Sequence, residues 1–80
     1  MGHARRRPKR LAEKLLQIRQ HLGVSQSELV RRLGVDMDYS TVSKFELDKN
    51  EPDLIVLLAH ARLAEVSLAQ IADDQLDLML

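Results

Sequence analysis

The sequence contains no cysteine and no tryptophan, and it has one phenylalanine and one tyrosine among its 80 residues. Without cysteine the chain can form no disulfide, no thiolate zinc site and no cysteine nucleophile. With so few aromatic side chains, the core has to be built from Leu, Val, Ile and Ala. Two prolines, three glycines and few runs of β-branched residues favour an all-helical fold. A chain of this length makes one domain that buries only about 60% of its unfolded surface, so dimerisation would add stability.

Several function classes lack their sequence signals. No apolar run approaches the roughly 20 residues that a transmembrane helix needs. The basic start is not followed by the apolar segment of a signal peptide, so we expect a cytoplasmic protein. His3, His21 and His60 are scattered without ligand spacing, so neither a metal site nor a cofactor is expected. No strand–turn–helix elbow or glycine-rich phosphate loop is present, and the sequence therefore does not predict an enzyme.

The charges are balanced overall, with 12 basic and 12 acidic residues, but they are separated along the chain. Residues 1–10 contain five bases and no acid, whereas residues 51–80 contain six acids and only Arg62 as a base. Such a molecule can turn its basic end to phosphates and keep its acidic end away from them. We expect residues 1–8 to form a basic arm that follows DNA phosphates or enters a minor groove, with a solvated tail as the alternative. The candidate DNA-binding residues at this end are Arg5, Arg6, Arg7, Lys9 and Arg10.

The first helix is expected over residues 9–22, where apolar residues recur at helical spacing. Gly23 follows the last of them and would end the helix. The inward residues are Leu11, Leu15, Ile18 and Leu22, and the solvated face carries Glu13, Lys14, Gln17, Arg19 and Gln20.

Two further helices are expected in the second half of the chain. A fourth helix should begin at residues 51–53, and as the most hydrophobic helix it should be the central one. Ser67 is the expected N-cap of a short fifth helix over residues 68–73. The apolar residues 75–80 either fold back on the core or take part in a dimer contact. The chain therefore divides into the arm, a helical domain over residues 9–74 and an apolar tail.

Residues 25–52 predict two short helices joined by a turn. Ser25 and Glu28 have the spacing of a capping box, in which each side chain satisfies a backbone N–H at the helix start. Gly34 suits a left-handed end to this helix. A third helix fits residues 39–47, and the whole stretch has the pattern of a DNA-reading helix-turn-helix. The inward residues of the third helix are Val42 and Phe45, and its outward residues are Ser40, Thr41, Ser43 and Lys44.

Several short motifs follow one another in an order and at a spacing typical of one family. They are Ser25-Gln26-x-Glu28-Leu29, Leu33-Gly34-Val35, Thr41-Val42-Ser43-x-x-Glu46, Pro52-x-Leu54 and Val66-Ser67-Leu68. Over residues 11–72 the chain resembles the phage-repressor/Cro-like (XRE-type) helix-turn-helix family. The resemblance implies an all-α, five-helix lambda-repressor-like DNA-binding domain, with its helix-turn-helix at the second and third helices, that works as a dimer on an inverted repeat.

The resemblance also implies roles for single residues. In the third helix, Tyr39, Ser40 and Lys44 match positions that face base edges, and Thr41 and Ser43 match positions directed at the DNA backbone. Elsewhere, Gln26 matches a phosphate or base contact, Lys49 and Asn50 match a loop that meets the phosphate chain, and Glu46 matches a structural acid. The chemistry fits these roles, because a lysine can donate to guanine O6 and N7 and a hydroxyl group can donate or accept.

The sequence departs from the family pattern around the turn. Val42 comes two residues later than usual, so residues 35–38 form a longer turn with Asp38 as the N-cap of the third helix. Val30 replaces the usual alanine between the second and third helices, so we expect the third helix to lie slightly farther out. Asp48 stands where the family has glycine, and Asp tolerates a left-handed backbone better than most residues. The acids Asp36, Asp38 and Asp48 flank the third helix and would repel phosphates, and Leu47 stands where the family often has a base.

The sequence thus predicts a sequence-specific DNA-binding transcriptional regulator that forms a small homodimer on double-stranded DNA. The C-terminal end is a candidate binding site for a protein partner. The alternative is a protein-interaction module of the same fold, for example an antitoxin-like partner, with weak DNA binding. Salt-dependent binding to duplex DNA distinguishes the two, because each phosphate contact adds about 0.9 to the log–log salt slope.

Overall fold

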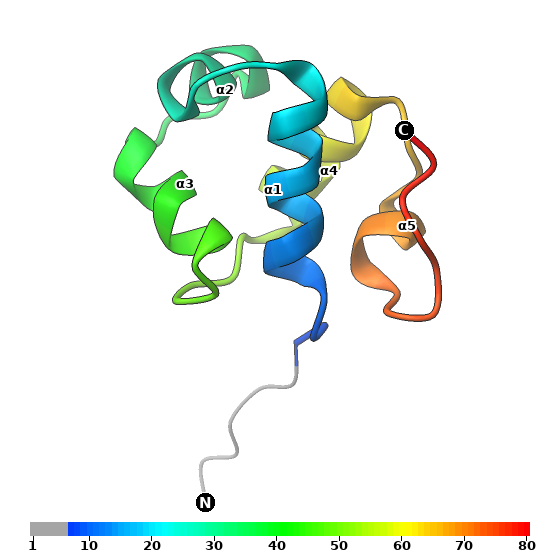
Figure 1. Cartoon of the computed structure of the whole chain (residues 1–80). Coiled ribbons are helices and arrows are strands. Elements are labelled where there is room, and N and C mark those ends of the chain that lie inside the picture. Colours follow the sequence, from blue (N-terminus) through cyan, green and yellow to red (C-terminus); the bar gives the residue numbers. More distant parts are fainter. Residues whose placement is uncertain (1–6) are drawn as a thin grey trace, which may run out of the picture.

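The computed structural model describes residues 7–80. Within this range the chain consists of helices joined by irregular segments, with no strand. The helices are α1 (Leu11–Leu22), α2 (Gln26–Leu33), α3 (Tyr39–Glu46), α4 (Leu54–Ala64) and α5 (Leu68–Ala72) (Figure 1). The predicted all-α, five-helix fold is therefore confirmed. The predicted bounds differ by one to three residues: α1 begins at Leu11, α3 ends at Glu46, α4 begins at Leu54 and α5 ends at Ala72. None of these helices is long and apolar enough to cross a membrane.

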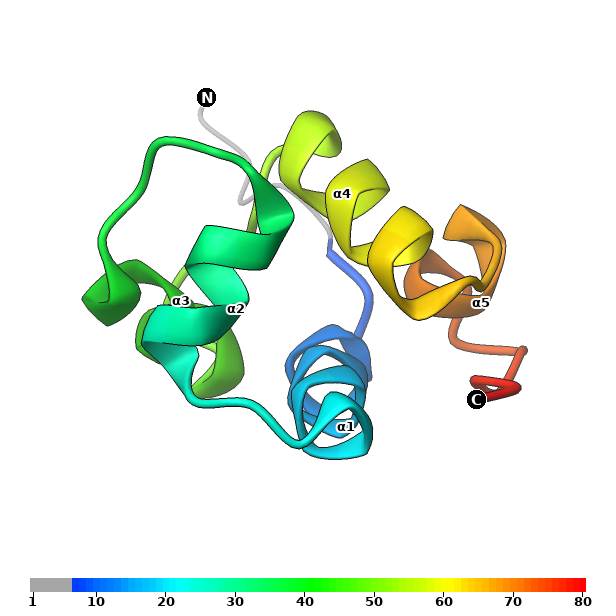
Figure 2. The same ribbon diagram turned by 90° about the horizontal axis from the view of Figure 1, so that it is seen from above.

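The helices are arranged around α1 and α4. Figures 1 and 2 show α2 and α3 together on one side of the molecule and α5 on the other, with α1 and α4 between them. Helix α4 thus lies centrally, as expected, together with α1, but it is not the most buried helix: only His60 and Ala61 of α4 are buried, and Leu54 and Ile55 in its first turn are 59% and 66% exposed. The apolar residues of α4 run around the helix instead of along one stripe, so one side of it remains outside.

The core consists of two neighbouring clusters. The larger cluster joins α1 to α3, α4 and α5 and contains Leu11, Leu15, Ile18, Phe45, Ala61 and Ile71. The smaller cluster joins α2 to α3 and contains Leu29, Leu33 and Val42. The inward positions predicted for α1 and α3 are thus confirmed, with Leu22 half-buried at the junction of the clusters. Since α3 contributes to both clusters, packing fixes which of its sides faces outward.

Four of the helices begin at side-chain caps that the sequence encodes locally. Ser25, Asp38, Asp53 and Ser67 accept hydrogen bonds from the backbone N–H groups of Glu28, Ser40, Val56 and Gln70. The capping box is only half formed, because the Glu28 carboxylate bonds to Arg31 and Arg32 instead of to the backbone of Ser25. Both arginines lie one turn further along α2 and offer the carboxylate charged donors, which bind it more strongly than a neutral N–H.

Helix α1 has no cap from its own neighbourhood. Its N-cap residue, Arg10, makes no side-chain capping bond. The carboxylate of Asp74 takes that place, since it accepts from the backbone N–H groups of Lys9 (2.9 Å) and Arg10 (3.0 Å). A residue far along the chain therefore satisfies donors at the start of the first helix, which are otherwise left without a partner.

Lys14 is buried inside the protein, although the sequence placed it on the solvated face of the first helix. Its side chain is 0% exposed. Its Nζ donates to the backbone carbonyls of Gln70 (2.7 Å), Asp73 (2.8 Å) and Leu76 (2.7 Å), which belong to the end of α5 and the following segment. The prediction failed because these acceptors are carbonyl groups at a helix C-terminus, which favour a cation and leave no side-chain signal in the sequence.

The C-terminal residues fold back on α1 and α5, as one of the two sequence alternatives proposed. The guanidinium of Arg10 donates to the carboxylate of Asp77 at 2.8 Å and to the carbonyl of Asp74 at 3.2 Å. Leu78 packs against the larger core cluster, and the backbone N–H of Met79 donates to the side-chain oxygen of Gln70. The segment is thus held by polar bonds along its length and one apolar anchor.

His60 is a core residue of α4. It is 1% exposed, and its Nδ1 lies 2.9 Å from the carbonyl oxygen of Val56, one turn earlier. Burial lowers the pKa of His60 below its ordinary value of 6.5, so the ring is neutral near pH 7. Within residues 7–80 no group of three or more His, Asp or Glu side chains is arranged to hold a metal ion. His3 lies outside the described residues.

Replacement of Lys14 tests the contribution of its three hydrogen bonds to backbone carbonyls. In the Lys14→Met variant we expect the free energy of unfolding to fall by about 2–4 kcal/mol, because three part-buried carbonyls lose a charged donor, while the cost of burying the ammonium group is removed at the same time. Urea denaturation measures the change. The matched control is Lys9→Met, which alters an exposed side chain and should change stability far less. Equal effects of the two substitutions would contradict this contribution.

Candidate nucleic-acid interface

The turn between α2 and α3 is long, as predicted. Residues 34–38 separate the two helices, with Gly34 in the left-handed region at φ 69° and Asp38 capping α3. Val30 is half-buried and packs on the smaller core cluster, so its bulk fills space beside Leu29 and Val42. The wider separation of the two helices expected from Val30 stays a prediction.

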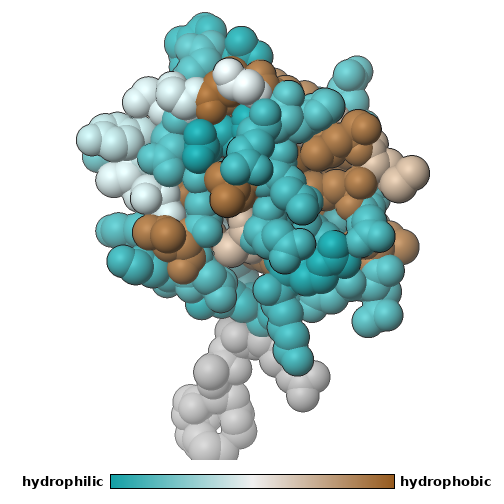
Figure 3. Space-filling model, in the orientation of Figure 1, coloured by the Kyte–Doolittle hydropathy of each residue, from teal (hydrophilic) through white to brown (hydrophobic). Residues whose placement is uncertain are grey.

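The outward side of α3 is polar and carries a single charge. Tyr39, Ser40 and Lys44 are exposed, and Ser43 is half-buried. In Figure 3 this side of the molecule is pale, the colour of side chains with intermediate hydropathy. Within residues 7–80, Lys44 has no ion-pair partner. The side therefore combines hydroxyl groups, which can donate or accept, with one cation that can donate, and these are the groups that read base edges.

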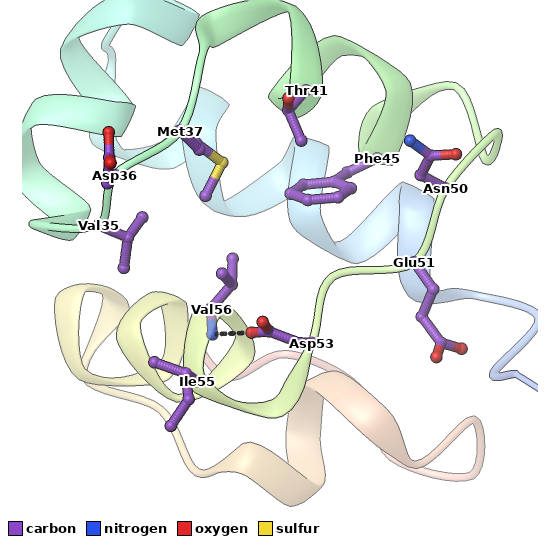
Figure 4. A pocket seen from close by; sticks show the side chains of 10 residues that line it. All are labelled: Val35, Asp36, Met37, Thr41, Phe45, Asn50, Glu51, Asp53, Ile55 and Val56. Atoms are coloured by element: carbon purple, nitrogen blue, oxygen red, sulfur yellow. Dashed lines mark hydrogen bonds between the residues drawn. The ribbon is translucent and has the colours of Figure 1, made fainter.

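Thr41 lies between the outward side of α3, where Lys44 is its neighbour three residues on, and the inner side that carries Phe45. The sequence placed it on the outward face, but it is half-buried and lines a hollow between α3 and α4 together with Phe45 (Figure 4). Thr41 and Phe45 are four residues apart and so share one helical face. Because Phe45 is in the core, Thr41 turns inward with it.

The loop after α3 folds back on the end of that helix. The backbone N–H groups of Lys49 and Asn50 donate to the carbonyl of Lys44 at 2.8 and 3.3 Å. Asp48 adopts the left-handed conformation at φ 60°, as predicted from its place in the sequence. Lys49 and Asn50 are both exposed, and this fold-back holds their backbone next to the last turn of α3. Leu47, at the same place, is 62% exposed.

A buried carboxylate holds α3 against α1 and α2. The side chain of Glu46 is 6% exposed and accepts from Arg19 Nε (2.8 Å) and Nη2 (3.0 Å) and from the Gln26 amide (3.1 Å). Arg19 also donates to the carbonyl of Val24, in the connection between α1 and α2. The sequence had placed Arg19 on the solvated face of α1, because its partner lies 27 residues away. Gln26, a predicted DNA contact, thus uses one amide donor inside the protein and is half-buried.

The predicted basic residues near the N-terminus differ in their positions. Arg7 lies beside the loop after α3, where its Nη2 donates to the carbonyl of Asp48 at 3.0 Å. Lys9 is exposed, whereas Arg10 is turned to the C-terminal segment and bonded there. Arg5 and Arg6 lie outside the described residues. The structure therefore brings Arg7 together with the end of α3 and directs Arg10 elsewhere.

The acids around α3 are partly engaged. Asp38 caps α3, and the carboxylate of Asp48 lies 3.7 Å from Nε of Arg7. Hydrogen bonds from Arg31 and Arg32 lower the pKa of Glu28 to about 2. Asp36, in the turn, is exposed and within the described chain has no ion pair. Of the three acids beside α3, only Asp48 therefore lies next to a cation within residues 7–80, and the repulsion of phosphates is reduced at that position.

Substitution of Glu46 tests whether this carboxylate secures the three helices. Glu46→Ala leaves the Arg19 guanidinium, which is only 21% exposed, without its partner. We expect the free energy of unfolding to fall by about 2–4 kcal/mol, since removal of one member of a largely buried pair is strongly destabilising. A double-mutant cycle with Arg19→Met should show a clear coupling energy. Glu28→Ala, which breaks exposed ion pairs, is the control and should cost much less; additive effects of the Arg19 and Glu46 substitutions would exclude the network.

Comparison with known proteins agrees with this geometry. The fold is similar to that of the P22 c2 repressor protein, solved in complex with a synthetic operator, with 23% identity, a TM-score of 0.70 and coverage of 80% of this chain and 94% of that one. It is also similar to the restriction-modification controller protein C.AhdI from Aeromonas hydrophila, with 22% identity, a TM-score of 0.67 and coverage of 78% and 91%. No curated protein sequence matches the chain. A helix-turn-helix family model matches residues 15–71. The chain therefore belongs to the helix-turn-helix family of DNA-binding regulators, of the phage-repressor/Cro-like (XRE) type.

Proposed function

We propose that this protein is a sequence-specific transcriptional regulator that binds an inverted-repeat operator as a homodimer, with α3 in the major groove. The observation that carries the proposal is the outward side of α3, which exposes the hydroxyl groups of Tyr39 and Ser40 together with Lys44, a lysine without an ion-pair partner in residues 7–80. The fold shared with the P22 c2 repressor, a protein solved with operator DNA, supports it.

The side chains near α3 have separate roles in this proposal. Lys44, Ser40 and Tyr39 read base edges, with Lys44 as a donor to guanine O6 and N7. Lys49 and Asn50 in the following loop contact phosphates, and the free N–H groups at the start of α2 add a further phosphate contact. Arg7 extends this basic surface, because it lies against Asp48 in the same loop. Phosphate contacts set orientation and affinity, and the base contacts set the sequence.

Selection of binding sites from a random duplex library tests the proposal directly. We expect the enriched sites to be inverted repeats whose half-sites are about 10–10.5 base pairs apart, or a multiple of that distance, because a two-fold dimer presents two copies of α3 to one face of the duplex. Two chains should bind each site. Enrichment of single, asymmetric half-sites by one chain would contradict the homodimer. No salt-dependent binding to any duplex would favour the alternative, a protein-interaction module of the same fold.

Lys44→Ala should weaken binding to the selected site by about 1–3 kcal/mol per half-site and relax the preference at one base position. The physical reason is the loss of a donor that pairs with one base edge. Binding to a panel of single-base operator variants, measured by fluorescence anisotropy, reports both effects. Arg62→Ala, an exposed arginine on α4, is the charge-matched control and should leave the preference unchanged. An equal loss of affinity for every sequence would place Lys44 on a phosphate instead.

The basic arm should contribute affinity without sequence preference. Replacement of Arg5 and Arg6 by alanine should weaken binding to all duplexes and lower the log–log salt slope by up to about 1.8 per chain, because each phosphate contact contributes about 0.9. A titration at several salt concentrations measures the slope. The control removes the same charge from exposed sites elsewhere, Arg32 and Arg62. If the two double variants have the same slope, the arm does not contact phosphates.

A further inference from the structure

A hollow of about 720 Å³ lies between the turn that follows α2, the inner side of α3 and the first turn of α4. Figure 4 shows Val35 and Met37 of the turn, Phe45 of α3 and Val56 of α4 pointing into it. We call this hollow the turn groove. Its volume is in the range of sites that bind small molecules or side chains, and the additional turn residues form one of its walls.

The turn groove has an apolar floor and acidic edges. Asp36 lies at the edge formed by the turn and Asp53 at the edge formed by α4, and both are exposed (Figure 4). Neither residues 35–38 nor residues 51–56 contain a lysine or an arginine. Ile55, which lines the groove, is 66% exposed and extends the apolar surface onto α4.

The charge of these edges decides which occupant fits. Carboxylates at both edges repel DNA phosphates, so the groove is not an extension of the DNA-binding surface. A second copy docked across a two-fold axis would set the same acidic edges against each other, and like charges brought together oppose association. A segment that carries Lys or Arg beside a large apolar side chain is complementary to both the edges and the floor.

We infer that the turn groove binds a basic, apolar segment of a partner protein. A Leu, Ile or Phe side chain of the segment enters between Met37, Phe45 and Val56, and flanking Lys or Arg side chains pair with Asp36 and Asp53. The groove lies on the inner side of α3, which carries Thr41 and Phe45, whereas Lys44 is on the outward side. The partner and the base-reading side chains therefore use different sides of the same helix, and Asn50 alone is shared between the groove and the proposed phosphate contacts. This inference is independent of the proposed DNA-binding function.

A library of random 12-residue peptides, displayed on phage and selected on the immobilised full chain, tests the inference. The enriched peptides should combine Lys or Arg with Leu, Ile or Phe. The tightest of them, synthesised and added to the ¹⁵N-labelled protein, should shift the amide signals of residues 35–37, 45 and 53–56. Acidic or purely polar enriched peptides, shifts confined to other residues, or no enrichment over a blank surface would overturn the inference.

Two substitutions test separately how the acidic edges and the apolar surface of the turn groove contribute to peptide binding. Asp36→Lys should weaken binding of the synthetic peptide roughly five- to tenfold, because it exchanges an ion pair for a repulsion. Ile55→Gln should weaken it several-fold through loss of apolar contact. The controls make the same changes at exposed sites outside the groove, Glu13→Lys on α1 and Leu80→Gln at the C-terminus, and should bind the peptide as the parent does. Weakening by the controls to the same extent would overturn the inference.

The other two occupants give distinct results. If the groove were an interface between copies of this chain, the signals of residues 35–37 and 53–56 would shift with protein concentration alone, and the peptide would dissociate a dimer. If it were a DNA contact, a DNA duplex of any sequence would displace the peptide. Either result overturns the inference, and neither depends on whether the chain recognises a particular DNA sequence.

Discussion

The buried carboxylate of Glu46 is the interaction on which the rest of the structure depends. It accepts three hydrogen bonds, from Arg19 of α1 and Gln26 of α2, and so joins three helices at one point. An isolated helix as short as α3 is unstable in water, so its conformation and direction depend on these bonds and on the packing of Val42 and Phe45. Desolvation of an ion pair is costly, but the carboxylate is fully supplied with donors, which offsets that cost. The outward side of α3 is consequently held in one orientation.

A second polar centre secures the opposite end of the molecule. Lys14 donates hydrogen bonds to the carbonyl groups at the end of α5, Asp74 caps α1, and Arg10 bonds to Asp77. Much of the acidic C-terminal charge is therefore used within the protein, against bases at the start of α1. Arg7, Lys44 and Lys49, which take no part in these contacts, are the bases next to the outward side of α3. The acidic end of the sequence thus holds the start of α1, while other bases form the surface proposed for DNA.

Helix α3 presents two different sides, and the turn before it lines the hollow on one of them. The outward side carries Ser40 and Lys44, with a composition suited to base edges, while the inner side forms a wall of the turn groove with Phe45. The turn residues Val35 and Met37 supply apolar surface to that groove, and Asp36 supplies its charge. DNA binding and partner binding are in this way assigned to separate surfaces on one short helix.

The sequence by itself determined the number and order of the helices, the side-chain caps of α2 to α5 and the inward positions of α1 and α3, because these depend on residues a few positions apart. Ser25, Asp38, Asp53 and Ser67 begin helices, and Gly23 and Gly34 end them, through hydrogen bonds and dihedral angles that are local to the chain. It also indicated the family and the residues of α3 that carry the proposed function.

Only the tertiary structure decided what the long polar side chains do. Lys14 and Arg19 looked solvated, since their partners lie 56 and 27 residues away and include backbone carbonyls that have no signature in sequence. Thr41 turned inward and Leu54 and Ile55 remained exposed, because the fit of α3 against α4 depends on all the helices at once. Local patterns specify which face of a helix is apolar, whereas the partner of each charge is specified by the assembled fold.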